Sequence, residues 1–408
     1  MSMAEVDRIE TAGSSAMTRL ADTPSPWTVC DALDPPLWVW RTPKGDTRIG
    51  AGQARRIVAE GETRFGAIAD SLGTLTSGLE RDTAGPRAFV GACFFADPTP
   101  GTPWTGYPAA IAAVPNLQLV WSGPETTVSV LDATTSGPPT RRLAEVVDRL
   151  ASIEPPERMI PAVTDRRFEP SRGGYQAMVA AAIERLGRPP LEKVVLGGTL
   201  RLELDASPPL GAVLASLARR HPDCWIFAYA PSDTSVFVGA TPERLVSVAG
   251  DHLETVALAG SIGRGETAVA DDRLAERLLD RERGRHEHAS VVGDIVRRLG
   301  PLTEAVRVGG RSVRRLADVQ HIETPIEARL RDGVGLLDVA GRLHPTPAVG
   351  GRPRASALAA IRELEPIDRG WYAGPIGVID PAGDGTLAVA IRSARIDRTM
   401  ATLYAGNG

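Results

Sequence analysis

Three apolar segments follow one another closely near the end of the sequence: YAGPIGVID at residues 372–380, TLAVAIRSARI at 386–396 and ATLYAG at 401–406. Each is long enough for one strand, and short connections with Gly, Pro and Asp, which favour turns, separate them. Antiparallel strands can be joined by such short turns, whereas parallel strands need a long crossover. This stretch therefore predicts an antiparallel sheet.

The same pattern recurs upstream, where ERLVSVAG (243–250) and DHLETVALAG (251–260) predict a strand–turn–strand unit. Further strands are predicted at 191–204, 224–230 and 235–241. Helical spacing is confined to separate segments, at 173–186, 209–220, 272–299, 336–343 and 355–364. Because helices and strands are segregated rather than alternated, the sequence predicts an α+β fold with large antiparallel sheets, not a βαβ nucleotide fold.

The first part of the chain predicts mostly short strands, at 38–42, 87–95, 116–123 and 126–133, with helical segments at 52–79 and 140–153. Residues 1–25 are small and polar, and we expect a flexible terminus there. A proline-marked break, IEPPERMIP at 153–161, ends this part. We therefore expect residues 26–164 to form the N-terminal part of the unit and residues 165–408 its catalytic region.

Composition excludes several classes of protein. A net charge of −4 and a pI near 6.0 argue against a general nucleic-acid binder. No apolar run is long enough to span a membrane, and the N-terminus lacks the apolar core of a signal peptide. The three cysteines are scattered, which fits a reducing compartment and argues against a structural zinc site. The sequence has no GxxxxGK[ST] loop, so ATP is not an expected cofactor. We expect a cytoplasmic protein with a small-molecule partner, without nucleic-acid or membrane partners.

The basic residues are almost all arginine. Of 46 basic residues only Lys44 and Lys193 are lysine, and a codon bias toward Arg accounts for the ratio. Arg cannot be deprotonated in a protein, whereas Lys can act as a base. Lys193 opens the apolar segment KVVLGG, where it is either a strand-end lysine that reaches solvent or a general base with a lowered pKa.

Two glutamates are candidates for chemistry. Glu243, in VGATPERL, follows an apolar segment and is either a catalytic acid at a cleft or a solvated turn residue. Glu287, in the charged run DRERGRHEH, has apolar neighbours on one side. It is either part of a solvated helix face or a partly buried carboxylate that binds a hard cation such as Mg²⁺.

The last candidates would bind anions. Arg392 follows the apolar run LAVAI, and a buried arginine there needs a carboxylate or phosphate partner, either within the protein or on a ligand. Gly406 and Gly408 form a Gly-x-Gly whose backbone N–H groups could bind an anion.

In order along the chain, nine motifs resemble those of the chorismate-utilising enzymes. They are KVVL (193–196), GATPERL (239–245), ALAGS (257–261), RHEH (285–288), VQHIETPI (319–326), LHPTPAVGG (343–351), ELEPIDRGWYAGPIGVID (363–380), AVAIRSA (388–394) and LYAGNG (403–408). The resemblance is dense over about residues 165–408 and loose before them. It implies the family's fold, a single α+β unit whose antiparallel sheets and flanking helices surround a deep cleft.

The resemblance also implies the chemistry of the site. The substrate is chorismate, a dicarboxylate, and the likeness is greatest to the branch that converts it to isochorismate. In that branch the lysine that matches Lys193 activates water for attack at ring C2, and the glutamate that matches Glu243 protonates the departing C4 hydroxyl. The match to Glu287 implies a ligand of Mg²⁺, which binds the ring carboxylate. A monomer is the implied oligomeric state.

Substrate-binding roles follow from the same matches. Arg392 and Tyr372 correspond to residues that contact the enolpyruvyl carboxylate region, and the amides of Gly406 and Gly408 to carboxylate-binding amides. The remaining pocket motifs supply Gly260, Ser261, His321 and Ala348.

The branches of the family differ at two of these positions. The ammonia-using branch lacks the base lysine, so Lys193 favours water as the nucleophile. The salicylate-forming branch carries threonine where this chain has Ala348, so isochorismate is the favoured product and salicylate synthase the alternative.

Relatives in the family continue beyond the Gly-x-Gly into a segment that carries a second Mg²⁺ carboxylate, whereas this sequence stops at Gly408. We therefore expect weaker metal binding through Glu287, and a truncated or non-catalytic chorismate-binding protein is the second hypothesis.

Overall fold

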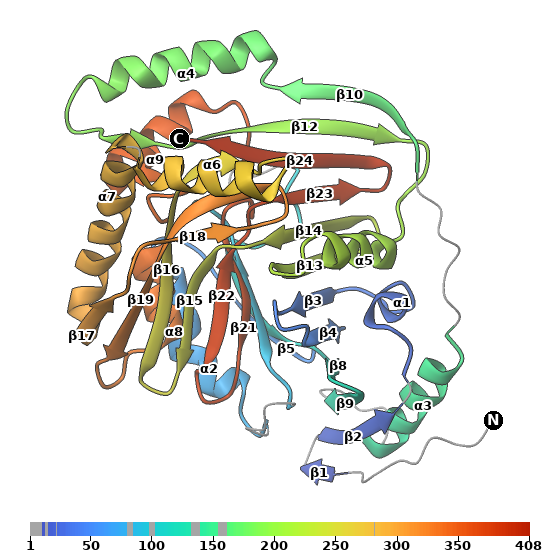
Figure 1. Ribbon diagram of the computed structural model, residues 1–408. Coiled ribbons are helices and arrows are strands. Elements are labelled where there is room, and N and C mark those ends of the chain that lie inside the picture. Colours follow the sequence, from blue (N-terminus) through green and yellow to red (C-terminus); the bar gives the residue numbers. More distant parts are fainter. Residues whose placement is uncertain are drawn as a thin grey trace.

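The computed structural model describes residues 10–12, 15–21, 23–79, 85–97, 103–131, 139–153, 161–280 and 282–408, with the backbone alone at 10–12 and 282–287. Over these residues the strands form two large sheets and one short ladder, with helices around them (Figure 1). Every described strand pair is antiparallel. The predicted α+β fold with large antiparallel sheets is confirmed.

The larger sheet has twelve strands that come from both ends of the chain. Their order is β1 (Glu10–Ala12), β2 (Ser15–Ala21), β9 (Glu125–Leu131), β8 (Leu117–Ser122), β4 (Thr47–Ala51), β3 (Leu37–Arg41), β13 (Trp225–Ser232), β14 (Ser235–Thr241), β23 (Ser393–Asp397), β24 (Met400–Asn407), β12 (Leu196–Leu204) and β10 (Val163–Glu169). The expected boundary between residues 164 and 165 stays a prediction, and strands from both sides of it share this sheet.

The second sheet has ten strands. Their order is β17 (Thr303–Val308), β19 (Val319–Leu330), β16 (His252–Gly263), β15 (Arg244–Ala249), β22 (Gly385–Val389), β21 (Pro375–Ile379), β6 (Ala88–Ala92), β7 (Ala110–Val114) and β5 (Arg55–Ala59), with β18 (Ser312–Arg315) paired to β19. A separate ladder joins β11 (Lys193–Val194) to β20 (Gly351–Arg352). It connects two segments that both reach the site described below.

Helices cover the outer faces of these sheets. They are α1 (Pro26–Cys30), α2 (Arg64–Leu75), α3 (Pro139–Ala151), α4 (Arg172–Leu186), α5 (Leu210–Arg220), α6 (Ala268–Asp280), α7 (Glu282–Leu299), α8 (Leu336–Leu343) and α9 (Arg354–Leu364). Helix α5 packs on α1 beside the larger sheet, and α7 packs on β16 of the second sheet. None of the helices assigned here is long and apolar enough to span a membrane.

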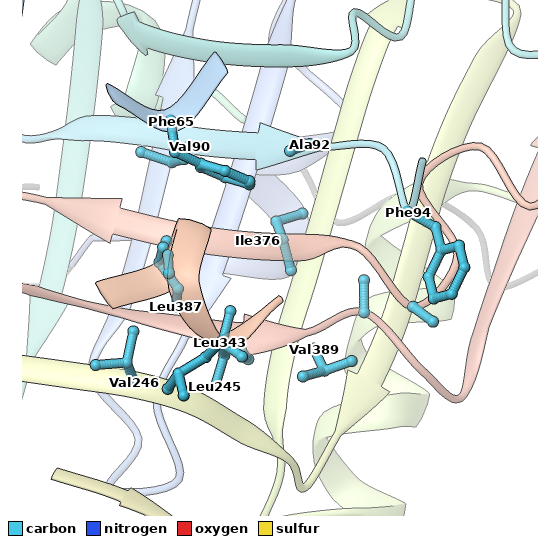
Figure 2. Packing of buried hydrophobic residues seen from close by; sticks show 14 of the residues in the cluster. Phe65, Val90, Ala92, Phe94, Leu245, Val246, Leu343, Ile376, Leu387 and Val389 are labelled. Carbon is cyan, nitrogen blue, oxygen red and sulfur yellow. The ribbon is translucent and has the colours of Figure 1, made fainter. Parts of the chain in front are cut away.

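The main hydrophobic core takes residues from both large sheets, such as Trp38 of β3 and Phe89 of β6, and from helices α2 and α8. Figure 2 shows Leu343 of α8 above side chains of β15 and β22, where Leu245 and Leu387 are buried. Burial of each such side chain contributes about 1.5–3 kcal/mol. Because Leu343 ends α8, this packing fixes the start of the following loop, residues 344–350, which lines the site.

The predicted helix over residues 52–79 is wrong in its first part. Residues Arg55–Ala59 form β5, an edge strand that pairs with β7, and α2 begins only at Arg64. The β-branched pair Ile57 and Val58 suits a strand, and the partner strand supplies its backbone hydrogen bonds. Sequence periodicity alone merged the two elements.

The long helix predicted over 272–299 is divided into α6 and α7, and residue 281 lies outside the described residues. The two segments bury different apolar stripes: α6 buries Leu278, whereas α7 buries Val291 and Ile295. Only α7 packs on both α8 and β17, so the two stripes cover different parts of the sheet.

The N-terminal segment also differs from its prediction. Residues Ser15–Ala21, expected to be flexible, form β2, which pairs along its whole length with β9. Ala16, Thr18 and Leu20 alternate into the interior and are buried, which is the pattern of a strand with one covered face.

Candidate active site

A cavity of about 500 Å³ lies where the two large sheets meet. It takes residues from β16 and β19 of the second sheet, from β24 of the first, and from the β11–β20 region. It brings together all the predicted catalytic and substrate-binding residues: Lys193, Glu243, Gly260, Ser261, His321, Ala348, Tyr372, Arg392, Gly406 and Gly408. The side chain of Glu287, the predicted metal ligand, lies outside the described residues.

Glu243 occupies a rigid, buried position between β14 and β15. Its backbone N–H donates to Oγ1 of Thr241 (3.2 Å), and its carbonyl accepts from the N–H of Val389 (2.9 Å). The side chain is 7% exposed, and burial raises its pKa to about 7. A hydrogen bond from Oγ1 of Thr346 (3.4 Å) and the charges of Lys193 and Arg392 partly oppose that rise. The carboxyl is therefore poised to hold or release a proton near neutral pH.

Lys193 is the first residue of β11 and lies opposite Arg352 in the short ladder. Lys193 and Glu243 line the same cavity, and the positive charge of the protonated lysine lowers the pKa of Glu243. The chain end lies close to it: a Cβ at Gly408 would be 3.3 Å from Cε of Lys193 and 3.0 Å from Cγ2 of Val195. The glycine therefore leaves room beside the lysine.

His321 links Ser261 to Arg392. Its Nδ1 lies 2.8 Å from Oγ of Ser261, and its Nε2 lies 3.1 Å from Nη2 of Arg392. Arg has donors only, so Nε2 accepts, and in the neutral ring the proton lies on Nδ1 and is donated to Ser261. Burial and the charge of Arg392 lower the pKa of His321 to about 4, which keeps the ring neutral at pH 7. The histidine thus orients the guanidinium without adding charge.

Arg392 is held in an uncommon backbone conformation, with φ of 51°. Non-glycine residues in this left-handed region are infrequent, and they cluster at functional sites. No carboxylate of a described side chain lies within ion-pair distance of its guanidinium. The internal ion pair that the sequence left open is therefore absent from this part of the chain, and donors remain for an anionic ligand.

Tyr372 and two glycines shape the other wall. Tyr372 is buried and stacks on Tyr404, with ring centroids 5.1 Å apart at 20°. Burial raises the pKa of the Tyr372 hydroxyl to about 12, so it stays protonated. A Cβ at Gly406 would lie 2.8 Å from that hydroxyl, so only glycine allows β24 to pass so close.

The side chains that hold this wall in place were not among the candidates that the sequence indicated. Arg369 and Glu365 form a buried ion pair, with Nε 2.8 Å from Oε2. Arg369 also donates to the carbonyls of Val195 (2.7 Å) and Val349 (2.9 Å), two residues that line the cavity. The motif ELEPIDRGWYAG contains both residues of the pair, but nothing in its spacing reveals these carbonyl contacts.

The described side chains do not by themselves form a magnesium site. None of them joins a group of three or more His, Cys, Asp or Glu placed to hold a metal. The lining that can be described offers one carboxylate, Glu243, and its raised pKa makes it a poor ligand for a hard cation near neutral pH.

Comparison with known proteins gives a consistent result. A family model described as chorismate binding enzyme matches residues 22–408. The salicylate biosynthesis isochorismate synthase of Pseudomonas aeruginosa is 42% identical over 238 residues, which cover 58% of this chain and 50% of that protein. The isochorismate synthase MenF of Bacillus subtilis is 33% identical over 338 residues, covering 81% of this chain and 71% of that protein. The chain thus spans about half the length of the first relative.

Solved structures share the fold. The menaquinone-specific isochorismate synthase MenF of Escherichia coli has a TM-score of 0.82 at 23% identity, covering 100% of this chain and 91% of that one. Anthranilate synthase component I of Streptococcus pneumoniae has a TM-score of 0.72 at 20% identity, covering 100% and 90%. Since the family model covers nearly the whole sequence and the cavity gathers the motifs of that family, the chain belongs to the chorismate binding enzymes.

Proposed function

We propose that this protein isomerises chorismate to isochorismate by adding water at ring C2 and releasing the C4 hydroxyl. The observation that carries the proposal is the pairing of Lys193 with Glu243 in one cavity. One is a basic side chain that can accept a proton, and the other is a carboxyl whose pKa of about 7 lets it donate one. Relatives at 42% and 33% identity are named isochorismate synthases, which supports the same reaction.

The two side chains divide the proton transfers. Lys193, as the neutral amine, takes a proton from water while the water oxygen forms a bond to C2. The ring double bonds shift, the C4–O bond breaks, and Glu243 gives its proton to the departing hydroxyl, which leaves as water. Lys193 is then protonated and Glu243 ionised, so before the next turnover Lys193 must release a proton and Glu243 must regain one. An acid and a base with separated environments suit this exchange.

The rest of the cavity would bind the two carboxylates of the substrate. Arg392, held by neutral His321, offers a guanidinium whose fork fits a carboxylate. Tyr372 remains a hydroxyl donor, and we propose that the backbone amides near Gly406 and Gly408 serve the second anionic group. We propose that Glu287 binds Mg²⁺, whose positive charge would offset the negative charge of the substrate.

The nucleophile and product follow from two positions. Lys193 supports water over ammonia, since a base is needed for water and not for an amine. Ala348 lies on the cavity wall and supports release of isochorismate over further elimination to salicylate.

The experiment is an incubation of the folded chain with chorismate and magnesium, followed by chromatography. We expect isochorismate, without salicylate fluorescence and without pyruvate. Salicylate with an equal amount of pyruvate would replace the proposal with the salicylate synthase reaction. Absence of turnover in a sample whose circular dichroism shows a folded protein would overturn the enzyme assignment for this chain.

A further inference from the structure

A second charged cavity, of about 320 Å³, lies near the β11–β20 ladder. It is lined by five arginines, one carboxylate and a proline, which are Arg297, Arg298, Arg342, Arg352, Arg354, Glu192 and Pro353. We call it the arginine pocket. Its arginines come from the ends of α7 and α8, from β20 and from the start of α9.

Only part of this charge is neutralised within the protein. Arg352 forms an ion pair with Glu192, its Nε lying 2.7 Å from Oε2. Arg297 and Arg298 share the buried carboxylate of Asp294. Of the five arginines, Arg342 and Arg354 therefore remain without such a carboxylate partner among the described residues.

The guanidinium groups of Arg342 and Arg354 make no hydrogen bond or ion pair with any group that the structure describes. Their charges instead act against their neighbours. Burial lowers the pKa of Arg354, the charges of Glu62 and Asp294 partly oppose that fall, and the guanidinium of Arg342 adds to it. Burial also lowers the pKa of Arg298; the carboxylate of Asp294 opposes this, whereas the charges of Arg354, Arg297 and Arg342 add to it. Since Arg stays charged in proteins, this repulsion favours an added anion.

Helix ends explain some of these arginines but not all. Cations are favoured at the C-terminal ends of α7 and α8, where Arg298 also donates to the carbonyls of Leu343 and Pro345 (3.1 Å each). Arg354 is different because it begins α9, an eleven-residue helix whose N-terminal end favours anions over cations. The charges of Glu62 and Asp294 favour the Arg354 guanidinium, but neither carboxylate forms an ion pair with it among the described residues.

We propose that the arginine pocket binds a small, multiply charged oxyanion of the phosphate class, which joins Arg342 to Arg352 and Arg354. The guanidinium fork matches phosphate oxygens, and several arginines in one cavity require more than one negative charge on the ligand. The volume of the pocket suits a small anion and excludes a folded partner.

One loop connects the arginine pocket to the cavity that contains Lys193 and Glu243, which we call the catalytic cavity. Arg342 and Arg352 stand at the two ends of the loop 344–350, which carries Thr346 beside Glu243 and places Val349 in the cavity wall. At its far end Gly351 has φ of 133°, and a Cβ there would lie 2.2 Å from the carbonyl oxygen of Lys193. An anion that joins both ends of the loop would hold this close contact. The proposal does not depend on the reaction proposed above.

The test is isothermal titration of the full chain with inorganic pyrophosphate, without magnesium and at constant ionic strength. We expect saturable binding that Arg342→Gln with Arg354→Gln weakens at least about tenfold, since two charge-assisted contacts are lost. Arg392→Gln, in the catalytic cavity, and Arg311→Gln, on the exposed β17–β18 connection, should bind pyrophosphate like the wild type. Bound pyrophosphate should also slow amide exchange in residues 344–350.

Two outcomes would overturn the site. One is the absence of saturable pyrophosphate binding by the wild-type chain. The other is binding that Arg392→Gln abolishes and the double variant retains, because the anion would then occupy the catalytic cavity. If the double variant does not fold, the single variants Arg342→Gln and Arg354→Gln decide between the same outcomes.

Discussion

The catalytic cavity and the arginine pocket lie close to the same two-residue ladder, yet they are built from different side chains. Lys193 of the ladder lines the catalytic cavity, whereas Arg352 opposite it and the preceding Glu192 line the arginine pocket. The catalytic cavity contains Lys, Glu and His, which can exchange protons. The arginine pocket contains arginines, which keep their charge at every accessible pH.

The difference between the two cavities can be compared with the ratio of lysine to arginine in the chain. Arginine supplies 44 of the 46 basic residues, so a basic position is arginine by default. The exception at 193 coincides with the cavity where Glu243 has a raised pKa. Lys193 thus lies in the cavity that holds the carboxyl with the raised pKa, whereas the basic residues of the arginine pocket are all arginine.

The largest effect is expected for Lys193→Arg, which replaces the lysine of the catalytic cavity with the residue found at nearly every other basic position. The charge remains but cannot accept a proton, so turnover should fall at least about 100-fold while the fold is kept. Chorismate turnover and circular dichroism check both parts. Lys44→Arg is the matched control, because the other lysine of the chain lies outside both cavities. Wild-type turnover by Lys193→Arg would remove the base assignment.

Glu243→Gln should reduce turnover by about 100-fold or more, because the amide cannot donate the proton to the leaving hydroxyl. The variant keeps the shape of the side chain and the contact with Thr346. Rate measurements under saturating chorismate test this prediction. A rate near that of the wild type would assign the acid to another group.

The same substitution should stabilise the protein above pH 7. The pKa of Glu243 is raised from 4.5 to about 7 in the folded state, so between these values the folded chain holds a proton that the unfolded chain has lost. Stability contributed by this residue therefore falls as the pH rises from about 4.5 to 7. Glutamine does not ionise, so the variant avoids this loss in the free energy of unfolding, which is at most about 3 kcal/mol. Urea unfolding at pH 4 and 8 should give equal stability at pH 4 and a more stable variant at pH 8. Equal stability at both values would contradict the raised pKa.

Much of the fold is predictable where hydrophobic alternation is clear and turns are short. The hairpin β13–β14 and the helices α4 and α5 begin and end within two residues of their predictions. Strand β17 is not predicted because most of its side chains are exposed and its short run TEAVRV does not alternate regularly between apolar and polar residues. Its pairing comes from β19, a partner that local sequence does not reveal.

The site was predictable through ordered motifs and less so through local chemistry. Thr346 and Arg369 escaped prediction because their roles depend on contacts between distant segments. The hydrogen bond from Arg369 to Val195 joins residues 174 positions apart. Motifs identify which residues matter, whereas only the fold determines which carbonyl or carboxylate each one reaches.

A smaller effect is expected for Glu287→Gln, which tests whether the catalytic cavity needs a cation beyond its own side chains. Loss of one carboxylate ligand should raise the magnesium concentration for half-maximal activity by about tenfold. A magnesium titration measures this, with Glu276→Gln, on the exposed face of α6, as the control. Overlapping titration curves for both variants and the wild type would argue against ligation by Glu287.

The smallest effect is expected for Thr346→Val, which should change the pH dependence of turnover slightly. The Thr346 hydroxyl donates to Glu243 and so favours the ionised carboxylate, which lowers its pKa. Without that hydrogen bond the pKa of Glu243 rises, so the limb of the pH–rate profile that falls near pH 7 should move upward by less than about one unit. Thr346→Ser keeps the hydroxyl and should leave the limb in place. If both variants shifted the limb equally, the loop would act on Glu243 through packing rather than through this hydrogen bond. Because arginines do not titrate in this range, Arg342→Gln should leave the position of the limb unchanged, which sets the proton chemistry of one cavity apart from the fixed charge of the other.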